Sequence, residues 1–469
     1  MTINIYHRNG AFISIITLFV LLIVALAPLP FGSNRPESWN LISLFVGVLA
    51  LASLVTISKG KKNRSLLRKL IIPACLVLLT LAFIVVQSSS LFPVMHTPLW
   101  PQMSLIISDS NISSISVNPT LTLSNLTLYF CYISIFWLAV ITSTSNEATW
   151  KQLGFILFIG SFYSVYGIIV FFSGNNYILW FPKWAYWGDL TSVFVNRNSF
   201  ATYAGLIVVC NLALLIKEFK RLDTRNIRNF LQANSQQTIR IYLLSLALLT
   251  NLTAIFLTHS RGGFLATAIG IFALFLITLI KKRQNTKYTL GVAVIFFLSL
   301  LWFVTTLSGD ATFFRLSNTT LDSSVRDEVY LLVIEGIKAS PFLGWGYGTF
   351  EESFRAFYSD QVGGVNWDKA HNTYLEIMFE LGLVFGILFF APLFLVSLQL
   401  IKGVIRRKTE YLIPAIGIAS LALSAAHALV DFSHQIPAIA ILFAWILGIT
   451  FAHCLPGRRR SESREQARK

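Results

Sequence analysis

Arg261 lies between two apolar runs, Ile241–Leu257 and Phe264–Ile280, each long enough to cross a bilayer. The turn that joins these runs reads Thr-His-Ser-Arg-Gly-Gly over residues 258–263. A guanidinium at the mouth of a membrane span costs about a few kcal/mol unless an anion meets it. Because a guanidinium binds phosphate through paired N–H donors, we expect the phosphate of a lipid-linked molecule here.

A second arginine, Arg197, has the same placement before the apolar run 199–216. Its neighbours Asn196 and Asn198 add hydrogen-bond donors and can cap the helix that follows. Taken alone, Arg197 is equally well explained as an interfacial anchor. Together with Arg261 and His371 on the same outer side, it favours a binding site.

His371 precedes the apolar run that starts at residue 374, so it is expected in or just before the first helical turn. The positive end of a helix favours the neutral imidazole. Since a neutral imidazole accepts a proton, His371 is a candidate general base. An interfacial histidine that caps the helix is the alternative.

Other polar residues can support such a site. Arg326 begins a predicted helix of the longest outer segment, where a solvated helix-end charge is the alternative. Asp431 and His434 follow the next-to-last apolar run, and either a catalytic or a structural Asp–His pair is open. Glu376 and Glu380 share one helix face, which suits acid–base chemistry or, more often, arginine partners.

Metal and nucleotide sites are not indicated. The Gly-x-Gly-x-Gly sequence at 344–348 lacks the strand–helix context of a dinucleotide site. The four cysteines all lie in apolar runs, which fits neither a disulfide framework nor a metal cluster. We therefore expect no cofactor and no metal.

A membrane scaffold must position these residues. Of the 469 residues 55% are hydrophobic and 12% charged, and a soluble domain has about twice that charged fraction. The sequence predicts an all-α integral membrane protein, and we interpret the first run as a retained span rather than a signal peptide. The twelve predicted spans are 11–29, 40–57, 70–87, 126–143, 153–173, 199–216, 241–258, 263–280, 288–305, 374–400, 412–430 and 438–455.

The distribution of charge orients these spans. With the N-terminus inside, 28 of the 37 lysines and arginines fall in the cytoplasmic segments. This bias is typical of a multi-span membrane protein, so the net charge of +16 indicates topology and anionic lipid rather than nucleic acid. It also places Arg197, Arg261 and His371 on the outer face.

The outer segments differ in character. Segment 88–125 is rich in Ser, Thr and Asn, and segment 174–198 is aromatic. Segment 306–373 contains an amphipathic run, 325–338, and a second short helix at about 350–358, which predicts a folded loop. The predicted division is therefore 1–305 for spans 1–9, 306–373 for the loop, 374–455 for spans 10–12 and 456–469 for a basic cytoplasmic tail.

Six short motifs together resemble the bacterial O-antigen ligase and polymerase superfamily. The similarity covers most of the chain and is strongest from about 190 to 435. The motifs are Pro-Leu-Pro-Phe-Gly (28–32), Asn-Arg-Asn-Ser-Phe-Ala (196–201), Ser-Arg-Gly-Gly (260–263), Gly-Trp-Gly-Tyr-Gly (344–348), His-Asn-Thr-Tyr-Leu-Glu (371–376) and His-Ala-Leu-Val-Asp-Phe (427–432).

The resemblance implies a twelve-span inner-membrane glycosyltransferase with its active site facing the periplasm. It implies a glycan donor on undecaprenyl diphosphate and no need for nucleotide or metal. It further implies that Arg197 and Arg261 hold the diphosphate and that His371 acts on the acceptor hydroxyl. Asn372 and Tyr374 belong to the same motif as His371. Segment 88–125 departs from the short loop that the resemblance implies.

The acceptor is left open by the sequence. A ligase delivers the glycan to lipid A-core, a polymerase adds it to another lipid-linked glycan, and a third kind of transferase uses a protein hydroxyl. We favour the ligase. The competing class is a non-catalytic transporter of the same lipid, which would place charges at mid-membrane and break its helices there.

Overall fold

The computed structural model describes residues 2–54, 61–90, 114–221, 235–282, 326–359, 362 and 366–454. Helices account for most of this part of the chain, as expected where lipid leaves backbone groups no other hydrogen-bond partner. The ninth predicted span, 288–305, lies outside the described residues, and so does the tail 456–469.

Eleven helices of the described chain correspond to predicted spans. They are α1 (Thr2–Leu26), α2 (Pro36–Leu54), α3 (Lys61–Ser88), α5 (Pro119–Thr142), α6 (Asn146–Phe172), α7 (Arg197–Arg221), α9 (Ser235–Leu257), α10 (Arg261–Lys282), α14 (Thr373–Arg406), α15 (Leu412–His427) and α16 (Pro437–Ala452). Eight helices of this part are long and apolar enough to cross a membrane, and Ala11–Leu26, Leu412–His427 and Pro437–Ala452 are shorter apolar helices.

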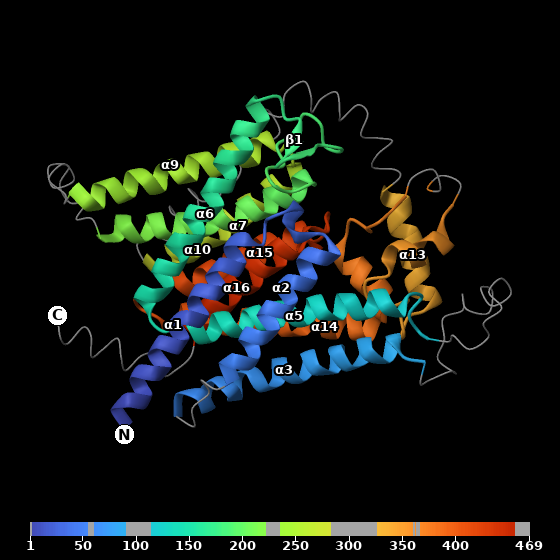
Figure 1. Ribbon diagram of the computed structural model, residues 1–469, viewed down its shortest axis with the longest axis horizontal. Helices are drawn as coiled ribbons and strands as arrows, with labels where there is room; N and C mark the ends of the chain where they lie inside the picture. The colour runs from blue at the N-terminus through green and yellow to red at the C-terminus, as the bar shows by residue number, and fades with distance from the viewer. Residues whose placement is uncertain are drawn as a thin grey trace.

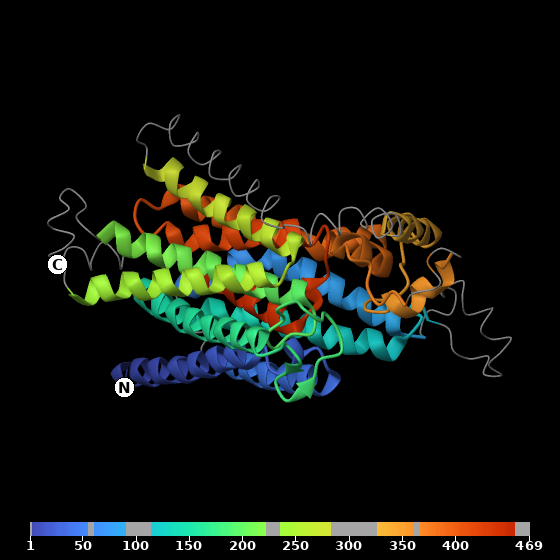
Figure 2. The same ribbon diagram turned by 90° about the horizontal axis from the view of Figure 1, so that it is seen from above.

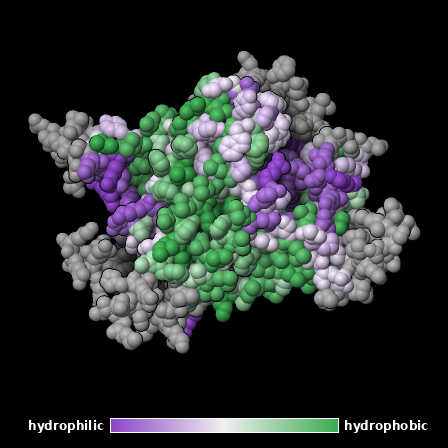
Figure 3. All heavy atoms as spheres, in the orientation of Figure 1, coloured by the Kyte–Doolittle hydropathy of each residue, from purple (hydrophilic) through white to green (hydrophobic). Residues whose placement is uncertain are grey.

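The helices run along one long axis of the molecule, as the two views in Figures 1 and 2 show. The start of α1 lies at one end of the bundle, and α13 (Phe350–Phe354) lies at the other. Hydrophobic residues form a belt across the middle of the face in Figure 3, and hydrophilic residues gather toward its two ends. This distribution is the one that a multi-span membrane protein requires.

The end of the bundle opposite α13 is basic. The ammonium of Lys69 donates to the carbonyl of Cys454 at 3.0 Å, and Arg407 donates to the carbonyl of His453 at 2.8 Å. Lys281 donates to the carbonyls of Ile405 and Arg407, both at 3.0 Å. Segments that the charge distribution assigned to one side of the membrane therefore contact one another.

Helix α7 is the centre of the bundle, where it packs against α6, α9, α10 and α15. Most of its apolar window is buried inside the protein rather than facing lipid. Small residues allow the close packing: a Cβ on Gly263 of α10 would lie 2.5 Å from the Cβ of Ala201 on α7. Gly263, the second glycine after Arg261, therefore brings the ends of α7 and α10 together.

The described part of the predicted loop 306–373 is folded, as expected. Residues 326–339 are helical, and Val329, Val333 and Ile337 are buried on one face. Helix α13 and the 3-10 turn η2 (Arg355–Phe357) match the second predicted helix. Residues 306–325 of the predicted loop lie outside the described chain.

The Gly-Trp-Gly-Tyr-Gly turn fixes this loop onto α14. Gly344 has a φ of +68°, and a Cβ there would lie 2.2 Å from the carbonyl oxygen of Glu380. The backbone of α14 leaves helical geometry at Gly382, with φ 72° and ψ 171°. The Gln87 side chain of α3 donates to the carbonyls of Leu343 and Glu380 at 2.7 and 2.9 Å. Residue 344 must therefore be glycine for two reasons: a side chain would collide with the Glu380 carbonyl, and the positive φ favours glycine.

Two details depart from the sequence prediction. Residues 119–125, assigned to an outer segment, begin α5, because Asn118 caps that helix by accepting from the Leu121 N–H at 3.0 Å. Strands β1 (Tyr177–Ile178) and β2 (Phe181–Pro182) form a small antiparallel hairpin in a chain that was predicted to be all helical. The remaining 3-10 turns are η1 (Phe31–Ser33) and η3 (Ser433–Gln435).

Gly448→Leu tests the packing of α16 on α5. A Cβ at Gly448 would lie 2.5 Å from the carbonyl oxygen of Phe136, so the larger side chain must push the helices apart. We expect a loss of about 1–3 kcal/mol in stability, measured as a lower melting temperature of the purified protein in detergent. Gly154→Ala is the control, since nothing lies within 4 Å of its Cβ position. Equal melting temperatures for the two variants would contradict the packing.

Candidate active site

The N-terminus of α7 is the point from which the site is built. Asn196 caps the helix, as predicted, with its Oδ1 accepting from the Asn198 N–H at 2.8 Å. The cap fixes the first helical turn, and so the directions of Arg197 and Asn198. These two neighbours reach two different buried carboxylates.

Arg197 contacts the first carboxylate, Asp189. Its Nη1 donates to Asp189 Oδ2 at 2.6 Å, and His259 Nδ1 lies 2.8 Å from Oδ1 of the same group. The guanidinium carbon of Arg197 also lies 5.7 Å from the ring centroid of Tyr186. Burial raises the pKa of the Asp189 carboxyl, but the neighbouring His259 and Arg197 lower it by more. The pKa therefore lies below its usual value, and the group stays ionised.

Asn198 contacts the second carboxylate, Asp431. Its Nδ2 donates to Asp431 Oδ1 at 3.1 Å, and the backbone N–H of Ser433 donates to Oδ2 at 3.1 Å. His371 Nδ1 lies 3.9 Å from Oδ1, an ion-pair distance rather than a hydrogen bond. Burial raises the pKa of Asp431, yet the nearby histidines and Ser433 lower it more, so Asp431 is also an anion.

Arg261 reaches this region through the start of α10. Ser260, directly before it, donates from its hydroxyl to Asn198 Oδ1 at 2.8 Å. The Arg261 side chain is exposed at this outer end. The two predicted phosphate-binding arginines therefore begin helices whose ends are hydrogen-bonded to each other.

His371 has a φ of +52°, in the left-handed region, just before α14. Asn372 caps α14 by accepting from the N–H groups of Tyr374 and Leu375, both at 3.1 Å. The loop helix holds the His371 backbone, since the Tyr330 hydroxyl donates to its carbonyl at 3.1 Å. The residue expected as base is thus fixed by both the loop and α14.

Arg326 lies on that loop helix, with an exposed side chain. Burial raises the pKa of Tyr330 and of Tyr186, and the charge of Arg326 lowers both. Arg197 acts on Tyr186 in the same direction. Arg326 is therefore near enough to add positive charge to the region of Arg197.

A cavity of about 200 Å³ lies next to these groups. His371 and Tyr186 line it from opposite parts of the chain, and Asn196 and Ser199 line it beside Arg197. Neither Arg197 nor Arg261 is among its lining residues. The structure thus places His371 in the cavity and the arginines beside or beyond it.

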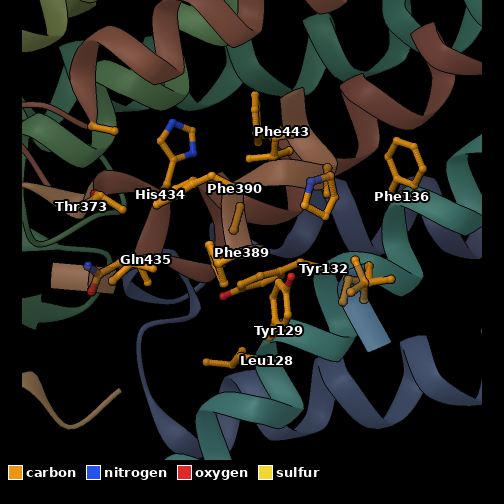
Figure 4. Close-up of a pocket in the computed structure, with 18 of the residues that line it drawn as sticks. Leu128, Tyr129, Tyr132, Phe136, Thr373, Phe389, Phe390, His434, Gln435 and Phe443 are labelled. Carbon is orange, nitrogen blue, oxygen red and sulfur yellow. The ribbon is translucent and has the colours of Figure 1, made fainter. Parts of the chain in front are cut away.

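A larger groove of about 1720 Å³ adjoins the cavity. The two share Asn34, Asp368, Phe432 and Ile436 as lining residues. In Figure 4, His434 and Gln435 lie toward one side of the groove and Phe136 toward the other, with aromatic rings between them. These rings and the lining α3 residues Ala74, Val77 and Leu78 make most of the groove wall apolar.

Two further predicted site residues, Tyr374 and His434, belong to the larger groove. Both line it, with the Tyr374 hydroxyl donating to the carbonyl of Ala425 at 3.0 Å. Burial lowers the pKa of His434 to about 3, so its ring is neutral. Neither residue lines the cavity of His371.

Glu376 has a different partner from the one expected. Its Oε1 lies 3.3 Å from Lys369 Nζ, and its Oε2 accepts from the Ala370 N–H at 2.9 Å. The partner is not the arginine that we favoured. Lys369, which lies two residues before His371, contacts the carboxylate instead. Glu376 therefore anchors the segment before His371.

Sequence reasoning missed Asp189, Tyr186 and His259 as site residues. Asp189 had a signal, since it is the one acid in the aromatic segment 174–198. His259 stood next to the Ser-Arg-Gly-Gly motif without being assigned a role. Nothing in the sequence around Asp189 or His259 indicates that their side chains meet.

The comparisons with known proteins bear on this region. Residues 246–391, which contain Arg261, the loop helix and His371, match the O-antigen ligase family. The comparison with curated proteins gives no match. The family match confirms the resemblance to the O-antigen ligase superfamily that the motifs indicated.

Proposed function

We propose that this protein is an inner-membrane glycosyltransferase that moves a glycan from a polyprenyl diphosphate to an acceptor hydroxyl on the periplasmic face. The observation that carries the proposal is the environment of Tyr186. Tyr186 lies under the Arg197 guanidinium and lines the same cavity as His371. The proposed phosphate-binding cation therefore contacts a residue that lines the cavity of the proposed proton acceptor, which supports their action on one substrate.

The chemistry follows from these groups. His371 takes the proton of the acceptor hydroxyl, and Asp431 stabilises the imidazolium that forms. The acceptor oxygen attacks the anomeric carbon, and the diphosphate leaves. Arg197 and Arg261 stabilise the negative charge that grows on the leaving diphosphate, so positive side chains supply what a metal ion supplies elsewhere. A single displacement inverts the anomeric centre.

The groove supports a lipid-linked substrate. It is lined largely by apolar residues of α3, α5, α14 and α16, and it meets the His371 cavity at Asp368 and Phe432. A long isoprenoid or acyl chain fits such a groove, because it buries apolar surface while its phosphate stays at the polar end.

Within the described part of the chain, the break of α14 at Gly382 is a feature that would suit the competing transporter function. That break receives the loop, since a Cβ on Gly382 would lie 2.6 Å from the Phe342 carbonyl. The buried Glu380 nearby accepts from the Phe350 N–H at 3.2 Å, which also ties it to the loop. These features favour a fixed loop over a transport path.

Substitution of the proposed groups tests the function. We expect His371→Ala to lower transfer about 10²–10⁴-fold and Arg261→Ala about 10²–10³-fold, because one removes the base and the other the leaving-group charge. Arg261→Lys should also fail badly, since a point charge does not bind phosphate in a bidentate manner. The measurement is glycan transfer by purified protein in detergent, with lipid-linked donor and acceptor extracted from the producing bacterium.

Glu37→Gln is the matched control, because Glu37 is an exposed acid in the first turn of α2 at the same end of the bundle. It should transfer like the unmodified protein. Near-normal activity of His371→Ala would remove the general-base assignment. Absence of transfer by the unmodified protein, which here has no membrane gradient, would favour the transporter.

Filling the groove tests where the lipid chain lies. Ala74 and Ala82 are both exposed on α3, but only Ala74 lines the groove. We expect Ala74→Trp to raise KM for the lipid-linked substrate several-fold and Ala82→Trp to leave it unchanged, because only the first occupies the lipid path. Identical KM values for the two variants would place the chain elsewhere.

The acceptor is tested in a strain that lacks the protein. We propose a ligase, in which case long glycan chains accumulate on the lipid carrier because they are not delivered to lipid A-core. Single repeat units on the carrier would instead identify a polymerase of the same superfamily. Mass spectrometry of the extracted lipid-linked glycans separates the two outcomes.

A further inference from the structure

We propose that His259, held by Asp189, is the proton donor to the leaving diphosphate and so the acid partner of His371. This inference rests on the proposed function. It concerns a residue to which neither the motifs nor the family match assigns a role.

The first support is a structural parallel between the two histidines. His259 and His371 have φ values of +51° and +52°, and each lies two residues before a helix start, at Arg261 and Thr373. Non-glycine residues occupy this left-handed region infrequently, and such positions gather at functional sites. Two histidines with similar φ values, each just before a helix start, suggest paired roles.

The second support is that each histidine faces a buried carboxylate from another segment. His259 Nδ1 lies 2.8 Å from Asp189 Oδ1, and His371 Nδ1 lies 3.9 Å from Asp431 Oδ1. The two carboxylates are joined through consecutive residues, because Arg197 contacts Asp189 and Asn198 contacts Asp431. The two pairs therefore flank one helix end.

The third support is the accessibility of His259. Its side chain is 45% exposed, against 6% for Asp189. With Nδ1 directed at the carboxylate, Nε2 is the atom that can meet a ligand, and within the described residues no hydrogen bond to Nε2 is found. When both ring nitrogens carry protons, Nδ1–H faces the carboxylate and Nε2–H can donate to a ligand.

The position of His259 assigns it to the leaving group rather than the acceptor. It shares Asp189 with Arg197 and lies two residues from Arg261, the two cations proposed to bind diphosphate. When the bond from the anomeric carbon to the phosphate oxygen breaks, its electron pair goes to that oxygen, which takes the Nε2 proton. The acceptor proton goes to His371, and exchange with water resets both rings.

Several charged groups surround His259. Asp189 comes from the outer aromatic segment, and Arg197 comes from α7. Lys183 donates to the Asp189 carbonyl at 2.7 Å, and burial lowers its pKa to about 8. From α6, the ring of Phe171 lies 6.5 Å from the imidazole. Any alkaline change in activity must therefore be traced to His259 by substitution.

The test is the pH dependence of kcat for the full chain, with lipid-linked glycan extracted from the producing bacterium as donor. An acid must be protonated to act, so the unmodified protein should lose activity as pH rises. We expect His259→Gln to lower kcat about 100-fold and to remove this alkaline fall, while the acidic fall due to His371 remains. Asp189→Asn, which keeps the shape of the side chain, should move the alkaline fall to lower pH.

The melting temperatures of His259→Gln and Asp189→Asn show whether a loss of activity comes from lost chemistry or from unfolding. Full activity of His259→Gln would overturn the inference, and so would an alkaline fall that persists in it, since another group such as Lys183 would then be responsible. If His259→Gln does not fold, Asp189→Asn decides. An alkaline fall at the same pH as in the unmodified protein would overturn this inference and leave the proposed function standing. No transfer by the unmodified protein would overturn the proposed function and this inference with it.

Discussion

The hydrogen bonds made by two consecutive residues at the start of α7 hold the outer end of the protein together. Arg197 binds Asp189 at 2.6 Å, and Asn198 binds Asp431 at 3.1 Å. Both carboxylates are more than nine-tenths buried, so each needs these donors to offset its loss of water. Because Asn198 also accepts from Ser260, the same turn connects the segments before α10 and after α15.

The rest of the bundle makes this arrangement possible. Helix α7 is buried on nearly all sides, so it cannot shift to suit a single contact. The glycines at 262 and 263 admit α7 and α15 against the start of α10, since a Cβ on Gly262 would lie 3.2 Å from His427 Nε2. The loop, docked on the break in α14, then fixes His371 from the other side. Rigid elements thus meet at one polar end beside an apolar groove, which suits a substrate with a charged head and a lipid chain.

Local features of the fold followed from the sequence, because they depend on residues close together in the chain. Apolar length located the helices, and amphipathic spacing located the loop helix at 326–339. The Asn196 cap was predicted for the same reason. The start of α5 was misplaced, because the signal there is one capping residue, Asn118, within a polar stretch.

Side-chain contacts between distant parts of the chain could not be predicted from the sequence. His259 and Asp189 are separated by 70 residues, and no local pattern indicates that they meet. For Glu376 an arginine partner was favoured over acid–base chemistry, but the carboxylate binds Lys369, because the sequence does not show which cation lies nearby. The roles of Arg197, Arg261 and His371 were inferred from placement and resemblance, and the structure adds the ion pair of Arg197 with Asp189 and the approach of His371 to Asp431.

A structure of the full chain with a polyprenyl diphosphate bound is the most direct test of the central claim. The account predicts that the diphosphate lies between Arg197 and Arg261, that the lipid chain enters the groove lined by α3 and α14, and that the His371 cavity opens beside the phosphate. A diphosphate bound away from both arginines, or one held where its attached sugar cannot reach His371, would contradict it.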